Sequence, residues 1–335
     1  MSRGAAILPA ALAAIAVSAA LTAAVVEMTR VELALARHRH AATDALLAAD
    51  ACVAHLVADV VPAWDLDALL AGPDGRRGSG DDGVLAPRTG CSGSADVPPG
   101  PAAPPRIRAR LTARGGRGQR RVEAIVGLSP VPGVGALLWL GRSPLDASVA
   151  GAIALDGTDA VDPAADAAAL AAPEWPERLD AWLAAEAGRV VTTSRTRAPL
   201  TAAAPPLTAL GTRVQAAGPA GAEALVPGTP APTLARVAGG LVITANLHGA
   251  GLLFVDGTLD IAGALDFTGL VVVSGDLRVR PGASLSVAGA LWTGAGALVV
   301  DGGLAVRRDG AALAGADGLL PLPRAAVLLG QRDLG

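Results

Sequence analysis

Residues 5–61, AAILPAALAAIAVSAALTAAVVEMTRVELALARHRHAATDALLAADACVAHLVADVV, decide the architecture of this chain. No charged residue occurs from Ala5 to Val26, and helix-forming sequence continues without a break to Val61, where Pro62 stops it. About 20 apolar residues suffice to cross a bilayer as a helix, and residues 5–61 would form a rod about 85 Å long. We therefore predict a basic leader over residues 1–4, followed by one transmembrane and stalk helix over residues 5–61.

The part of this helix beyond Val26 is amphipathic. Its apolar side chains recur at steps of three, four and seven residues: Val31, Leu35, Ala42, Leu46, Ala49, Val53, Leu56 and Val60. Such a stripe allows a helix to lie against a globular head or a neighbouring stalk. We interpret His38, His40 and His55, on or near the stripe, as surface or interface residues because no metal-ligand set converges with them.

The charges that flank the apolar segment do not decide its orientation, since Arg3 precedes it and Arg30, Arg37 and Arg39 follow it. Large domains are translocated largely regardless of charge, so we expect a single pass through the cytoplasmic membrane with the N-terminus inside. The alternative is a signal peptide cleaved near Ala20 or Ala24. Its apolar region would normally be shorter, about 7–15 residues, which favours the anchor.

The overall charge argues against nucleic acid as a partner. The chain has a net charge of −3 and a pI near 5.8, and phosphate binding needs a strongly basic face. Its one basic run lies in a glycine-rich, hairpin-like segment and comprises Arg106, Arg108, Arg110, Arg114, Arg117, Arg120 and Arg121. We interpret this run as a solvated strand edge, where charge blocks unwanted pairing.

The two cysteines, Cys52 and Cys91, lie near the end of the long helix and in the region behind it. If the chain beyond Val26 is exported, a disulfide is permitted there. It would tie the loop back onto the stalk and contribute about 3–4 kcal/mol by chain entropy. We favour this disulfide over unpaired buried thiols; two isolated cysteines make no zinc site.

Residues 62–105 form a predicted loop and linker that contains a weak calcium candidate, Asp74, Asp81 and Asp82. Carboxylate oxygens are suitable Ca²⁺ ligands, but the spacing is not that of an EF-hand. Asp-Gly pairs are ordinary turn formers. We therefore expect a solvated turn, with no metal and no cofactor in the protein.

Residues 106–235 form a predicted mixed region. Residues 106–141 have the alternation of a β-meander, with a turn at 115–118 and a further strand at 134–140 in which Trp139 is a packing anchor. Residues 174–183 form a short amphipathic helix, and residues 199–232 are a connection rich in Pro and Gly.

Residues 236–310 repeat a short unit. VDGTLDI at 255–261 recurs as VSGDLRV at 273–279 and as VDGGLAV at 300–306. Apolar runs joined by glycine turns at a short repeat are typical of a parallel β-solenoid, here of about four coils; a β-sandwich is the alternative. Residues 311–335 would cap the last coil and cover its edge. The predicted fold class is therefore α+β: a long N-terminal transmembrane and stalk helix, a mixed middle region, and a C-terminal parallel β-solenoid (β-helix).

The solenoid carries no catalytic constellation. Sugar-cleaving sites need carboxylates clustered at suitable separations on one face. The aspartates here lie at turns or alternate outward along the strands: Asp256, Asp260, Asp266, Asp276 and Asp301. His248 has no Ser or Asp partner at motif spacing. We interpret the aspartates as solvated turn residues and expect no enzymatic activity.

The two ends together resemble a known family. The segments RGAAIL (3–8), ELALAR (32–37) and ALLAADA (45–51) resemble the N-terminus of PilX-type minor pilins and related type IV pilus assembly proteins. GLLFVDGTL (251–259) and GLVVVSGDL (269–277) are similar to the glycine-rich repeat region of larger members. The resemblance implies a structural subunit that contacts other pilin-like subunits through its N-terminal helix in the inner membrane, and a place in the pilus or at the cell surface.

The resemblance also implies cleavage by a prepilin peptidase between Gly4 and Ala5. Most pilins begin the mature chain with Phe and have Glu at its fifth residue, whereas this chain has Ala5 and Pro9. The missing Glu resembles minor, tip-type components rather than the major subunit. Two alternatives stay open: a secreted solenoid acting as an adhesin or carbohydrate-active protein, and a membrane-tethered, bactofilin-like scaffold that polymerises through its solenoid ends.

Overall fold

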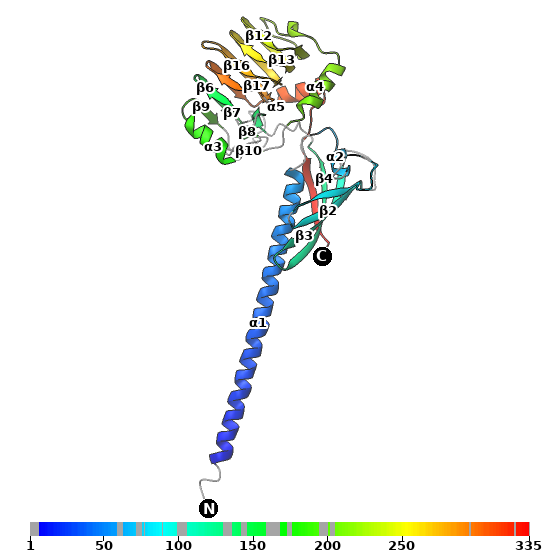
Figure 1. The fold of residues 1–335 in the computed structure, drawn as a ribbon, viewed down its shortest axis with the longest axis vertical. Coiled ribbons are helices and arrows are strands. Elements are labelled where there is room, and N and C mark those ends of the chain that lie inside the picture. The colour runs from blue at the N-terminus through cyan, green and yellow to red at the C-terminus, as the bar shows by residue number, and fades with distance from the viewer. Residues whose placement is uncertain are drawn as a thin grey trace, which may run out of the picture.

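The computed structural model shows a long helical rod, a small sheet along its upper part and a solenoid beyond it (Figure 1). It describes residues 7–58, 63–71, 76, 78–88, 90–98, 106–129, 136–141, 146–158, 168–172, 176–193, 200–201, 205–294, 296–324 and 326–334. Helix α1 spans Ile7–Ala58, so the predicted long helix is confirmed over these residues. The predicted stop at Pro62 lies outside the described residues.

The upper part of α1 packs against a five-stranded antiparallel sheet with the strand order β1-β2-β3-β4-β20. These strands are β1 (Val84–Arg88), β2 (Cys91–Asp96), β3 (Arg106–Gly115), β4 (Gly118–Leu128) and β20 (Ala326–Asp333). Alternation along β3 directs Ile107, Ala109, Leu111 and Ala113 into the core. A short helix, α2 (Asp67–Leu70), precedes β1. We call α1 and these five strands the helix–sheet unit.

The predicted hairpin at 106–128 is present, and its turn lies directly on α1. A Cβ added at Gly115 would overlap the backbone carbonyl of Asp44, and one added at Gly118 would overlap that of Ala41. Glycine is therefore required at both ends of the turn because the two backbones approach so closely.

The interpretation of the arginine run as a strand edge is wrong. Strand β3 lies inside the sheet and pairs with β2 on one side and β4 on the other. Its arginines form cross-strand ion pairs instead: Arg108 Nε lies 2.7 Å from Asp96 Oδ1, and Arg110 Nε lies 3.5 Å from the buried Glu123. The edge next to β4 is taken by β20, which comes from the far end of the chain.

The predicted C-terminal solenoid of about four coils is confirmed. Its strands stack in parallel, in register, in two sheets. One sheet contains β11 (Thr233–Ala238), β13 (Asn246–Asp256), β15 (Ala264–Val273), β17 (Ser284–Thr293) and β19 (Gly303–Arg307). The other contains the short strands β12 (Leu241–Ile243), β14 (Leu259–Ile261), β16 (Leu277–Val279) and β18 (Leu298–Val300).

A glycine ladder explains the repeated apolar runs. Gly251, Gly269 and Gly289 are aligned in neighbouring strands and have φ of +101°, +135° and +143°. A Cβ at Gly269 would overlap the carbonyl oxygen of Gly251. After this point in each strand both faces are buried. In β15, Val271 and Val273 point into the solenoid and Leu270 and Val272 point to its covered outer face.

The solenoid is larger than predicted because the middle of the chain extends it. The added strands are β5 (Ala136–Leu140), β6 (Ala147–Val149), β7 (Ala152–Asp156), β8 (Ala168–Ala172), β9 (Val190–Thr193) and β10 (Leu200–Thr201). Strands β5, β6 and β7 pair in parallel with β17, β18 and β19. The strand expected at 134–140 therefore belongs to the solenoid and not to a meander, and the boundary expected at residue 236 is wrong.

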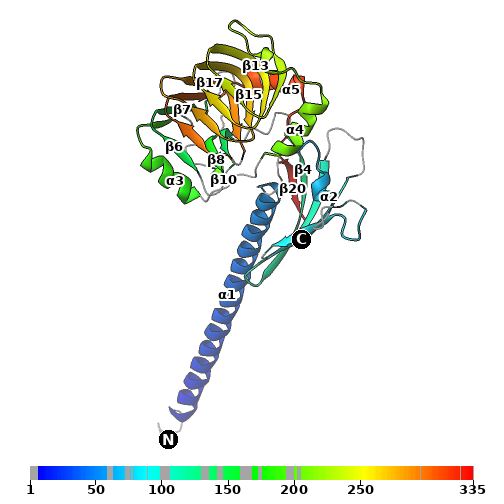
Figure 2. The ribbon, with the colours of Figure 1, turned by 45° about the horizontal axis from the view of Figure 1, so that its top comes forward.

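Among the described residues, the helices that cover the solenoid are α3 (Pro176–Ala185), α4 (Leu207–Ala216), the 3-10 helix η3 (Ala222–Ala224) and α5 (Gly310–Leu319). Leu179 of α3 and Leu225, after η3, are both buried in the solenoid core, and the Leu225 side chain lies close to Gly249 of β13. Helices α4 and α5 pack on the outer face of the larger sheet (Figure 2). The predicted short helix at 174–183 is thus present from Pro176 on.

The expectation that residues 311–335 cap the last coil is wrong. The edge of β17 and β19 is covered by β5 and β7, and β20 leaves the solenoid to pair with β4. The solenoid is therefore an insertion between two neighbouring strands of the helix–sheet unit.

Candidate assembly surface

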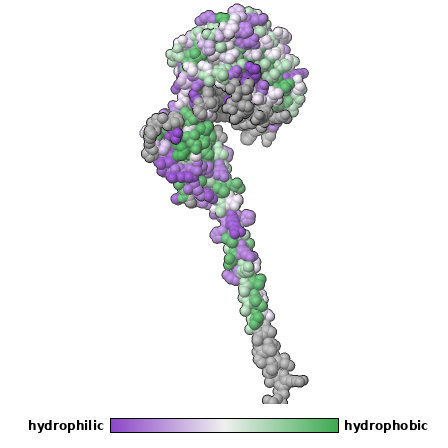
Figure 3. All heavy atoms as spheres, turned by 180° about the vertical axis from the view of Figure 1, so that it is seen from behind, coloured by the Kyte–Doolittle hydropathy of each residue, from purple (hydrophilic) through white to green (hydrophobic). Residues whose placement is uncertain are grey.

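The exposed part of α1 is the most prominent unpartnered surface of the described chain. Every residue from Ile15 to His40 is exposed. The large apolar side chains among them are between 45% and 66% exposed: Ile15, Val17, Leu21, Val25, Val26, Met28, Val31, Leu33 and Leu35. Figure 3 shows this part of the rod projecting beyond the rest of the molecule, with hydrophilic residues on its upper part and mainly hydrophobic residues below them on the visible face. We call residues 15–40 the free segment of α1.

The free segment has the composition of a helix that is normally buried against protein or lipid. Residues 15–26 carry no charge, and Ala16, Ala20 and Ala24 form a row of small side chains at steps of four. The polar hydroxyls are satisfied within the helix: Thr22 donates to the carbonyl of Ser18 at 2.8 Å, and Thr29 donates to that of Val25 at 2.9 Å. A helix that is apolar on all sides is usually buried in protein or lipid. Within the described part of the chain, no helix is apolar enough over a sufficient length to span a bilayer.

The five-stranded sheet covers only a few residues near the end of the predicted amphipathic stripe. Ala49 and Val53 are buried against β3 and β4, and Leu56 is half-buried beside them. Val31, Leu35 and Leu46 remain exposed. The contact between α1 and the sheet begins at Ala41. The apolar stripe therefore extends toward the N-terminus, beyond the part of the helix that the sheet covers.

Cys52 and Cys91 are brought together as expected from the sequence. They form a disulfide between α1 and the first residue of β2, with their Cα atoms 5.9 Å apart. This separation is in the range usual for disulfides. The bond attaches the sheet to α1 next to the buried residues Ala49 and Val53.

The remaining predicted site residues are described only in part. Asp81 and Asp82 lie in a turn, where they accept hydrogen bonds from the Ser79 hydroxyl, and Asp82 also accepts one from the amide of Gly78 at 2.8 Å. Asp74, Gly4 and Ala5 lie outside the described residues. Within the described residues, no three His, Cys, Asp or Glu side chains are placed to hold a metal ion.

The solenoid aspartates form ion pairs rather than a carboxylate cluster. Arg280 binds Asp260 through two hydrogen bonds of 2.6 and 2.9 Å, and this hydrogen bonding lowers the pKa of Asp260. Asp276 pairs with Arg278 and accepts a hydrogen bond from the amide of Ala297.

The alignment of the strands brings together one pair of residues that the sequence did not indicate. His248 Nδ1 lies 3.5 Å from Asp266, its neighbour in the next strand, and Ser286 follows in the strand after that. Asp266 stands between the other two, so the histidine is not positioned to deprotonate the serine, as a catalytic triad requires.

Comparison with known proteins identifies no family. No protein-family model matches the chain, and no curated protein matches it. Among solved structures, the chain is similar to the competence-associated pilin ComZ from Thermus thermophilus, with 10% sequence identity and a TM-score of 0.24, over 75% of this chain and 86% of that chain. A TM-score this low carries no argument about function, so the following proposal rests on the structure of the chain itself.

Proposed function

We propose that this chain is a pilin-like structural subunit, a minor component of the PilX type, in a type IV pilus or a related assembly. The free segment of α1 packs against the helices of other subunits, and the solenoid is the displayed head. The observation that carries the proposal is the division of α1 into an exposed apolar segment and a segment packed on its own sheet.

The sheet of the same chain does not cover the apolar surface of the free segment, so this surface needs another partner. Soluble monomers rarely expose apolar surface of this extent. The sheet contacts α1 only from Ala41 onward. Small residues allow close approach between helices in an apolar environment, and Ala16, Ala20 and Ala24 offer such a row. Before assembly, we propose, the free segment lies in the cytoplasmic membrane with the N-terminus inside. A prepilin peptidase then cleaves between Gly4 and Ala5.

Two observations support a displayed head over the alternative of a polymerising scaffold. Leu179 of α3 closes the core at one end of the stack, and Leu225 closes it at the other. In addition, the amides of Ala220 and Arg236 bond across the edge of β11 at 2.9 and 2.8 Å. Both ends therefore carry covers that would obstruct stacking of one solenoid on another. The proposed role is structural, with no catalysis and no bound cofactor.

The first test is the N-terminal sequence of the mature protein from membrane and sheared-surface fractions. A start at Ala5, with the apolar segment retained, is the expected result. A start near Ser18 to Val25 would overturn the proposal and leave a secreted solenoid. An intact N-terminus found in membranes alone would indicate a permanent tether instead.

A matched pair of substitutions tests the surface itself. Ala20→Arg places a charge in the uncharged part of the free segment, and Ala34→Arg places the same charge among residues that already include Glu32 and Arg37. We expect Ala20→Arg to lose recovery in the sheared-surface fraction and Ala34→Arg to retain it. Equal recovery of both variants would contradict assembly through residues 15–26.

A further inference from the structure

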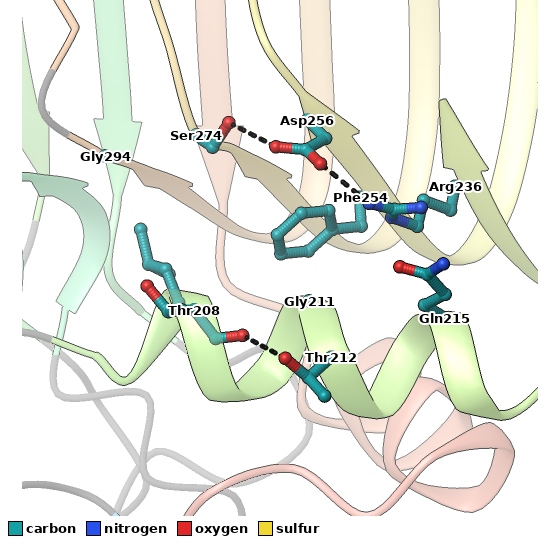
Figure 4. A pocket seen from close by; sticks show the side chains of 10 residues that line it. Thr208, Gly211, Thr212, Gln215, Arg236, Phe254, Asp256, Ser274 and Gly294 are labelled. Atoms are coloured by element: carbon teal, nitrogen blue, oxygen red, sulfur yellow. Dashed lines mark hydrogen bonds and ion pairs between the residues drawn. The ribbon is translucent and has the colours of Figure 1, made fainter. Parts of the chain in front are cut away.

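A pocket of about 420 Å³ with mixed polar and apolar lining lies between α4 and the end of strand β13 in the solenoid (Figure 4). It is remote from the free segment of α1, and the function proposed above does not use it. Its described lining comes from one face of α4 and from four neighbouring coils of the solenoid, those of β11, β13, β15 and β17.

Helix α4 contributes a row of hydrogen-bonding side chains. Thr208, Thr212 and Gln215 are spaced so that they share one face of the helix, and all three are exposed. Gly211 lies beside them, and a Cβ there would come within 2.8 Å of the Phe254 ring. Glycine at this position therefore lets the helix lie directly against the Phe254 ring.

The position of α4 is held from its other sides. Leu210 and Val214 are fully buried against the solenoid. The Arg213 guanidinium lies 4.2 Å from the centre of the Trp64 ring, and Trp64 Nε1 donates to the carbonyl of Pro321 at 2.6 Å. The helix that carries the polar row is thus held in place before any ligand binds, so binding does not have to order it.

The solenoid contributes a charge pair and an aromatic floor. Arg236 Nη2 donates to Asp256 Oδ2 at 2.7 Å, and the Ser274 hydroxyl lies 3.3 Å from Asp256 Oδ1. Figure 4 shows the Phe254 ring between this network and α4. Arg236 Nε is buried and has no hydrogen-bond partner in the described structure. A buried unsatisfied donor is costly, and a ligand oxygen in the pocket would relieve that cost.

The charge balance selects the class of ligand. The described lining residues carry one positive and one negative charge, and these two groups are paired with each other. An anion or a cation would therefore meet no net attraction. The other polar groups are hydroxyls and an amide, which exchange hydrogen bonds with hydroxyl groups. We propose that this pocket binds a neutral polyhydroxylated ligand, of the size of one or two sugar residues.

The inference is independent of assembly through α1, because the pocket lies wholly within α4 and the solenoid. The test uses the full chain in a detergent without a sugar headgroup and isothermal titration calorimetry. The probes are lactose, cellobiose and N,N′-diacetylchitobiose, with digalacturonate as the acidic comparison. We expect saturable binding of at least one neutral disaccharide and none of digalacturonate.

Three variants locate the binding. Gln215→Ala should weaken it about fivefold and Asp256→Asn about tenfold or more, since the second removes a charged hydrogen-bond acceptor. Ser286→Ala, on the exposed face of β17, is the control and should leave it unchanged. No saturable binding of any neutral disaccharide, binding of digalacturonate alone, or affinity unaffected by Gln215→Ala would each overturn the proposal. Gln215 is exposed, so its substitution keeps the test valid even if Asp256→Asn fails to fold.

Discussion

The helix–sheet unit and the solenoid bury different kinds of side chain. Where α1 meets its sheet the core consists largely of alanines, with Ala45, Ala49, Ala109, Ala113 and Ala124 all between 0% and 3% exposed. The solenoid core is built mainly of Leu, Val and Ile. Small side chains let the helix backbone lie close to the sheet, but they remove less apolar area from water. The disulfide is found in the unit with the thinner core.

This difference predicts that the two regions unfold separately. Hydrogen exchange followed by mass spectrometry in increasing urea resolves them, since peptides from 106–128 report on the helix–sheet unit and peptides from 264–293 report on the solenoid. Each substitution below should change protection in one region and leave the other unchanged.

The largest expected effect is in the solenoid. Phe267 is 3% exposed in the core, and Phe267→Ala should lower the unfolding free energy of the solenoid by about 3–5 kcal/mol through lost burial and a cavity. Protection of 264–293 should fall by that amount while protection of 106–128 is retained. A parallel fall in both sets of peptides would show that the chain unfolds as one unit.

The next effect is in the helix–sheet unit. Replacing Cys52 and Cys91 together by Ser opens the loop between them and should cost about 3–4 kcal/mol of stability. Protection should now be lost from 106–128 and kept in 264–293. The matched control is the unchanged protein with and without a reductant, which should reproduce the same shift; no loss of protection under either condition would refute a stabilising disulfide.

A smaller effect distinguishes the two parts of α1. Ala49 is fully buried against the sheet, so Ala49→Leu should overpack the contact and cost about 1–3 kcal/mol. Ala20→Leu makes the same change in the free segment and should alter the stability by less than about 0.5 kcal/mol. The urea dependence of exchange in 106–128 measures both variants, and equal destabilisation by both would mean that the free segment contacts the head.

The smallest effect is a dependence on pH. Hydrogen bonds from Arg108 lower the pKa of Asp96 in the sheet, and those from Arg280 lower the pKa of Asp260 in the solenoid. A carboxyl with a lowered pKa contributes stability above its unfolded pKa of about 3.9, and this is lost as pH falls through the folded value. Both regions should therefore weaken below about pH 4.

The variant Arg280→Leu sharpens the comparison under acid. It should make the acid-induced loss of protection shallower in 264–293 and leave that in 106–128 as it is. An unchanged acid response in 264–293 would show that the Asp260–Arg280 pair does not contribute to it.

The periodicity of apolar residues along the chain was sufficient to predict the long helix, the C-terminal coils and strand β3. The absence of a break between Ala5 and Val61 predicts α1, and the repeat of V-x-G-x-L predicts the coils from β12 to β19. The alternation of Arg106–Thr112 predicts β3. In each of these the periodicity reflects burial of one face or one stripe.

Strand partners distant in the chain could not be predicted in this way. Strands β5 to β10 carry no repeat. They join the solenoid because β5, β6 and β7 pair with β17, β18 and β19 far along the chain, and β8, β9 and β10 pair in turn with β5, β7 and β8. The arginines of β3 were interpreted as a strand edge because no strand was expected in residues 62–105, where β2 forms and pairs with β3. The distant strand β20 likewise completes the sheet beyond β4. The pocket is built from α4 and from four separate coils. Helix α4 lies in a connection where the Pro- and Gly-rich sequence gave no helical pattern.

The insertion of the solenoid between β4 and β20 bears on how such a protein can vary in evolution. The chain enters the solenoid in the coil of β5–β7 and leaves it from the adjacent coil of β17–β19. Coils added toward β10 or toward β11 would therefore leave both connections to the helix–sheet unit in place. Each additional coil would extend the head by about 4.8 Å. Length and surface of the head can therefore change by duplication or loss of coils while the helix and its sheet, and with them the fit into an assembly, stay the same.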